Sequence, residues 1–142
     1  MGINPYAQYQ KIQVETADQG KLLLMLYTGA LRYLNSAKRA LQEGDLEGVN
    51  RHLLRTEDIV TELMTALNFE AGAVAGSLMQ LYDYIHHLLM QGNIKKEMQY
   101  LEQAQALLVE LLNVWKEALG IEQAEEKNRE RTPEIPDLRS IR

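Results

Sequence analysis

The chain of 142 residues is long enough for one domain, and its apolar content of 46% supports a single hydrophobic core. It contains no cysteine, which excludes disulfide bonds and thiolate metal sites. The net charge of −5 argues against nucleic-acid binding, because contacts to phosphate dominate that affinity. No apolar run is long enough for a membrane span, and the N-terminus resembles neither a secretory signal nor an acylation site. We therefore expect a soluble cytoplasmic protein without membrane insertion.

Residues 1–17 are expected to form an N-terminal segment of their own. Asn4 suits the N-cap and Pro5 the first position of a short helix. Tyr6 and Tyr9, three residues apart, would lie on one side of that helix, each with an apolar ring and a polar hydroxyl. They could serve as a removable latch over a binding groove, or pack as terminal tyrosines commonly do.

Residues 18–120 carry the spacing of three and four residues that is typical of amphipathic helices. We expect helix starts at about Asp18, Asp45, Gly76 and Ile94, with Gly92 as a C′ glycine before Ile94. The absence of proline from 6–132 allows these helices to be long. Short connections between long helices favour an all-α fold, an antiparallel up-down four-helix bundle.

The predicted core consists of the apolar stripe of each helix. Its members are Leu23, Leu26, Tyr27, Ala30, Leu34, Ala37 and Leu41, then Val49, Leu53, Thr56, Val60, Leu63 and Leu67, then Leu78, Leu81, Tyr82, Ile85, Leu88 and Leu89, and finally Met98, Leu101, Leu108, Leu112, Trp115 and Leu119.

Residues 121–142 are half charged and contain two of the three prolines, so we expect a flexible C-terminal tail. Ile135, Leu138 and Ile141 follow one another at intervals of three. This spacing raises the hypothesis that the tail docks weakly in a partner-binding groove. A disordered solubilising tail is the simpler alternative.

The first and fourth helices are apolar over a wider arc than one bundle core needs. The arc covers roughly 200° in the first helix and roughly 220° in the fourth, against about 100° for an ordinary core-facing stripe. The surplus has three interpretations: a second packing neighbour within the chain, a groove for a partner's helix, or a homodimer interface. The helical spacing leaves all three open.

The sequence offers little chemistry. A di-iron bundle needs paired Glu-x-x-His motifs, and the chain has only the near match Asp83 to His86. His52 lies in a helix among charged residues and is the candidate for a phosphotransfer bundle. Without a catalytic triad or a phosphate-binding loop, we expect neither an enzyme nor a cofactor.

Several short motifs, in this order, resemble the FliS family of cytoplasmic chaperones for flagellin export. They are Asn4-Pro5-Tyr6 with Tyr9, Gly20-Lys21-Leu22, Met25-Leu26-Tyr27 with Gly29-Ala30, Glu62-Leu63, Leu67-Asn68, and Leu81-Tyr82-Asp83-Tyr84. The resemblance covers about residues 4–119. It implies a four-helix bundle that binds the C-terminal segment of flagellin, prevents premature polymerisation and delivers the client to the flagellar export gate. It also implies that the N-terminal segment caps part of the groove.

The surplus apolar arcs and the resemblance together predict a partner-binding groove. Free protein could be a monomer or a weak dimer. The residues expected to form the groove are Tyr6, Tyr9, Leu22, Met25, Leu26, Tyr27, Leu31, Tyr82, Leu107, Leu111, Val114 and Ala118.

Overall fold

The computed structural model describes residues 5–67 and 72–120, with the backbone alone for 5–18. Every regular element in these ranges is an α-helix. The four helices are α1 (Pro5–Gln42), α2 (Leu46–Thr65), α3 (Ala73–Lys95) and α4 (Met98–Leu119).

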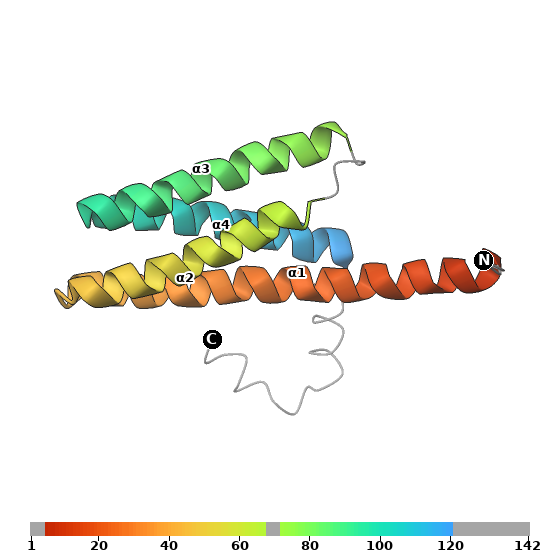
Figure 1. Ribbon diagram of the computed structural model, residues 1–142, viewed down its shortest axis with the longest axis horizontal. Coiled ribbons are helices and arrows are strands. Elements are labelled where there is room, and N and C mark those ends of the chain that lie inside the picture. The colour runs from red at the N-terminus through yellow and green to blue at the C-terminus, as the bar shows by residue number, and fades with distance from the viewer. Residues whose placement is uncertain (1–4, 68–71, 121–142) are drawn as a thin grey trace, which may run out of the picture.

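Consecutive helices run in opposite directions, and α1 extends at its N-terminal end beyond the other three (Figure 1). Both α1 and α3 pack against α2 on one side and α4 on the other. The predicted all-α, up-down four-helix bundle is therefore confirmed.

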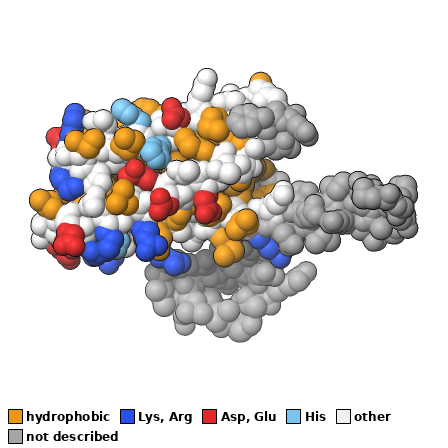
Figure 2. All heavy atoms as spheres, viewed as in Figure 1, with side chains coloured by type: hydrophobic (Ala, Val, Ile, Leu, Met, Phe, Trp, Pro, Cys, Tyr) orange, Lys and Arg blue, Asp and Glu red, His pale blue; other side chains and the backbone are white. Residues whose placement is uncertain are grey.

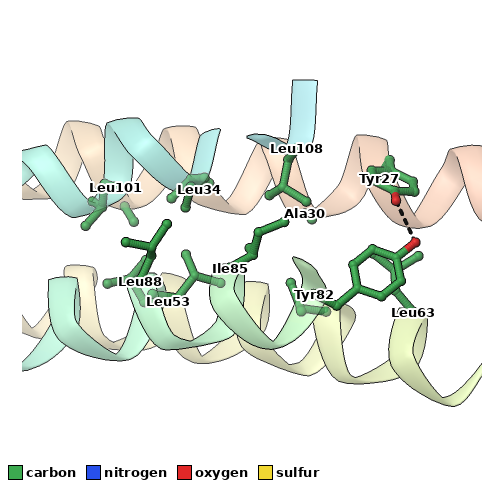
Figure 3. Packing of buried hydrophobic residues seen from close by; sticks show 14 of the residues in the cluster. Tyr27, Ala30, Leu34, Leu53, Leu63, Tyr82, Ile85, Leu88, Leu101 and Leu108 are labelled. Carbon is green, nitrogen blue, oxygen red and sulfur yellow. Dashed lines mark hydrogen bonds between the residues drawn. The ribbon is translucent and has the colours of Figure 1, made fainter. Parts of the chain in front are cut away.

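The core lies between the four helices (Figure 3). The predicted stripes supply it: Tyr27, Leu53, Ile85 and Leu108 are among the residues that are fully buried. Thr56 is the one buried polar residue of the described chain, and its Oγ1 donates a hydrogen bond to the carbonyl oxygen of His52 at 2.9 Å. Bonding to a carbonyl of its own helix satisfies the hydroxyl and lets Thr56 occupy a core position.

Asp45 begins α2 as predicted. Its Oδ1 accepts a hydrogen bond of 2.9 Å from the backbone N–H of Gly48, which satisfies one of the free donors of the first turn. Gly44 has a φ of 75°, and this allows the tight reversal between α1 and α2.

Asp18 does not begin a helix, and this prediction is wrong: α1 is continuous from Pro5. Residues 6–17 contain neither proline nor glycine, so nothing in the chain interrupts the helix before Asp18. Gly20 is tolerated because it provides close contact with α4. A methyl group there would lie 3.1 Å from Leu119 Cδ2.

The predicted boundary at Gly92 and Asn93 is also wrong. Helix α3 begins at Ala73 rather than Gly76, passes through Gly92 and Ile94, and ends at Lys95. Lys96 adopts φ 54° and donates its N–H to the Gly92 carbonyl at 2.8 Å, closing the last turn. Gly92 is buried against α4, where a Cβ would lie 2.5 Å from Leu101 Cδ1. The glycine therefore serves helix packing rather than helix termination.

Candidate partner-binding surface

The C-terminal half of α4 presents a row of apolar residues on its α3 side. Leu107, Leu111, Val114 and Ala118 follow Tyr100 by 7, 11, 14 and 18 residues, so all five share one side of the helix. This side of α4 faces α3. The Cβ of Tyr100 lies 3.2 Å from the position that a Cβ on Gly92 of α3 would take. Yet Val114 is 55% exposed and Ala118 is exposed as well.

The first turns of α3 provide the opposite wall. Val74 and Leu81 precede Gly92 by 18 and 11 residues and therefore lie on the α4 side of α3. Ala73, Val74, Ser77, Leu78 and Leu81 line a shallow hollow of about 360 Å³. Val74 is 65% exposed because α3 and α4 diverge toward this end of the bundle (Figure 1).

We call these two rows the α3/α4 surface. It consists of Val74, Ser77, Leu78, Leu81, Leu107, Val114 and Ala118. Leu111, another predicted groove residue of this row, is buried in the core.

The predicted groove residues of α1 lie elsewhere. Leu22, Met25 and Leu26 precede Gly29 by seven, four and three residues, and Gly29 faces Ile59 of α2. Leu22 and Met25 are 54% and 69% exposed along this α1/α2 side. Leu31 is half-buried and lies on the α4 side of α1. It follows Gly20 by eleven residues, which is three helical turns, and Gly20 contacts Leu119 of α4. The structure thus distributes the predicted groove over separate faces.

Tyr27 and Tyr82 are core residues in this structure, with exposures of 0% and 1%. Their hydroxyl oxygens point toward each other at 2.6 Å (Figure 3). The indole Nε1–H of Trp115 donates to the Tyr27 hydroxyl at 3.2 Å, which links α1, α3 and α4. Burial raises the pKa of both tyrosines, so both hydroxyls remain protonated. A contact between either tyrosine and a partner would require this cluster to open.

Tyr6 and Tyr9 belong to α1, but their side chains lie outside the described residues, and their role as a latch stays a prediction. His52, the phosphotransfer candidate, is half-buried with its ring stacked on Tyr33 at a centroid distance of 6.5 Å.

Sequence reasoning missed Val74 and Ser77 as surface residues, because it placed the start of this helix at Gly76 and assigned Leu78 and Leu81 to the core. The seven-residue spacing from Val74 to Leu81 and Leu88 is the signal that could have found this row. The divergence of α3 from α4, which leaves the row uncovered, has no signal in a single sequence.

On the described part of the face in Figure 2, several Lys and Arg side chains lie along the lower edge, and most Asp and Glu side chains lie above them among hydrophobic ones. Within 5–67 and 72–120, no group of His, Asp and Glu is arranged to hold a metal ion. None of the helices in these ranges combines the length and the apolarity that a bilayer span demands.

The four helices and their exposed apolar side chains define a small all-α bundle protein. Comparison with known proteins places it more narrowly. The profile of the family "Flagellar protein FliS" matches residues 2–122, and the chain belongs to this family.

The relatives named flagellar secretion chaperone FliS include proteins of three bacteria. The Bacillus subtilis protein is 35% identical over 126 residues, covering 89% of this chain and 92% of the relative. The Salmonella typhimurium protein is 32% identical over 119 residues, covering 82% and 88%. The Vibrio cholerae protein is 30% identical over 112 residues, covering 75% and 82%. The family supports a chaperone role in flagellar export.

Proposed function

We propose that this protein is a cytoplasmic chaperone that binds the C-terminal segment of flagellin and prevents its premature polymerisation. The client is then delivered to the flagellar export gate. The observation that carries this proposal is the α3/α4 surface, where Val74 and Val114 are both more than half exposed. Exposed apolar rows at helical spacing are suited to an amphipathic client helix.

The proposal has a physical reason on the client's side. A terminal segment that packs between subunits in a filament exposes apolar side chains before assembly, and such segments aggregate. Covering those side chains on an acidic bundle keeps the client monomeric. Ordering the client on binding lowers the affinity, which favours later release without nucleotide hydrolysis.

Calorimetric titration with a peptide of the flagellin C-terminal segment tests the proposal. We expect one peptide to bind each chain, and Val114→Glu to weaken binding by at least about tenfold, because a charge would be buried under the client. Leu54→Glu is the control, since Leu54 is 48% exposed on α2, outside the α3/α4 surface.

Two results would contradict the proposal. If the unaltered chain does not bind the peptide at micromolar concentrations, the C-terminal segment of flagellin is not its client. If the Val114→Glu variant and the unaltered chain bind the peptide with equal affinity, the α3/α4 surface is not the binding site of the peptide. Sedimentation velocity of the free protein separately tests whether this surface joins two copies of the chain.

A further inference from the structure

The hollow on α3 lies at the end of the bundle where α4 stops. Helix α4 ends at Leu119, and Gly120 follows with φ 72° as its C-cap. Ala73 and Val74, which line the hollow, belong to the first turn of α3 at the same end (Figure 1). The chain that continues from Gly120 therefore starts at the same end of the bundle as the hollow.

The composition of residues 121–142 matches this surface. The segment follows the family match, which stops at residue 122, so the family pattern does not account for it. Besides Ile121 it carries three large aliphatic residues at equal intervals, Ile135, Leu138 and Ile141, among charged and polar ones. A spacing of three places side chains on one side of either a helix or a polyproline II segment.

The charges at the two places are complementary. Arg139 and Arg142 directly follow Leu138 and Ile141, and with the single acid Asp137 they give residues 135–142 a net positive charge. Glu110 and Glu117 are exposed on α4, four residues before and three residues after Val114, and so border the apolar row. An arginine beside the docked aliphatic residues would face these carboxylates.

We propose that residues 135–142 of this chain dock on the α3/α4 surface in the free protein. Ile135, Leu138 and Ile141 lie against Val74, Leu81 and Val114 and cover the hollow. If the proposed function holds, this docking also competes with flagellin for the same surface.

The tether makes weak docking sufficient. Fourteen residues, 121–134, separate Gly120 from the docking segment, and a chain of that length without regular structure spans about 20 Å on average. Short flexible linkers give an effective concentration of about 1 mM, so even a millimolar dissociation constant leaves about half of the molecules docked. Weak docking also suits a segment that a client has to displace.

Methyl NMR of the full chain tests the docking without any client. The test variant replaces the three aliphatic residues together, and the control variant replaces three polar residues of the same segment. The test variant is Ile135→Ser, Leu138→Ser and Ile141→Ser; the control is Gln123→Ser, Asn128→Ser and Thr132→Ser.

We expect the methyl signals of Val74 and Val114 to shift in the test variant and to stay in place in the control. Leu46 and Leu54, exposed residues away from the α3/α4 surface, serve as internal references and stay unshifted in both. Unshifted Val74 and Val114 signals in the test variant would overturn the docking.

Calorimetry with the flagellin peptide then separates the two proposals. Removing the competitor should tighten binding by about two- to tenfold, the inverse of the fraction of molecules with a free surface. Shifted methyl signals with unchanged affinity would retain the docking and overturn the competition. Shifted signals with no flagellin binding in any variant would overturn the proposed function and leave the docking in place.

Discussion

Tyr27 and Tyr82 are the two largest side chains that are fully buried, and each brings a hydroxyl into the core. Their mutual hydrogen bond and the donation from Trp115 satisfy these groups, and the described core contains no buried side-chain N or O atom without a partner. A hydroxyl that loses its partner in such surroundings costs about 1–3 kcal/mol. The cluster therefore stabilises the bundle only as long as it is complete.

Tyr27→Phe should destabilise the protein more than Tyr82→Phe. The first change leaves both the Tyr82 hydroxyl and the Trp115 N–H without the partner they share, whereas the second leaves the bond between Trp115 and Tyr27 intact. We expect losses of about 1–3 kcal/mol in the free energy of unfolding, with the larger loss for Tyr27→Phe. Urea titration followed by far-ultraviolet circular dichroism measures both. Tyr84→Phe on exposed Tyr84 is the control, and the reverse order of the two losses would contradict the bond pattern.

Glu57 makes stability depend on pH. Burial raises the pKa of its carboxyl, His86 at 3.7 Å lowers it in part, and Asp58 raises it further. The folded state then holds a proton that the unfolded state has released, so stability falls as the pH rises from the unfolded pKa through the folded pKa. Above the folded pKa, the buried carboxylate of Glu57 is charged and its full destabilising effect on the folded state is present.

Glu57→Gln should therefore raise the melting temperature at pH 7 more than at pH 4, where the native carboxyl is itself largely protonated. Thermal unfolding at both pH values measures the two differences. Glu62→Gln, on the exposed side of α2, controls for the loss of one negative charge. Equal gains for Glu57→Gln at both pH values would show that burial of this carboxylate does not affect stability.

At the scale of the helices, two glycines of α3 should respond in opposite ways to alanine. At Gly92 an added methyl would meet Leu101 Cδ1 at 2.5 Å, so α3 and α4 would have to separate, at a cost of about 1–3 kcal/mol. At Gly76 nothing lies within 4 Å of the added methyl, and the better helix propensity should stabilise by about 0.5–1 kcal/mol. Chemical denaturation of Gly92→Ala and Gly76→Ala measures both. Stabilisation by Gly92→Ala would mean that the glycine does not set the distance between the helices.

The whole molecule shows which features a single sequence can predict. The number of helices, their order and their buried stripes follow from spacing, since apolar residues three and four apart must share a side of a helix. Whether a neighbour covers that side depends on the angle between helices, which leaves Val74 exposed and Tyr27 buried although both belong to apolar stretches. Gly92 resembled a helix end because a glycine is common there. The sequence alone does not show that Leu101 of α4 fills the space beside Gly92 where a side chain would lie.

The balance of charge and apolar surface over the whole molecule predicts how a client should bind. The chain is acidic and exposes apolar rows, so burial of apolar surface rather than charge pairing should supply the affinity. Raising the salt concentration from about 0.1 M to about 1 M shortens the screening length from about 10 Å to about 3 Å, and we expect it to change the affinity for the flagellin peptide by less than about threefold. The heat capacity change of binding should be negative. Calorimetry at several temperatures and two salt concentrations measures both, and Val114→Glu should make the heat capacity change smaller. A steep loss of affinity with salt would instead indicate that charged groups hold the client on the bundle.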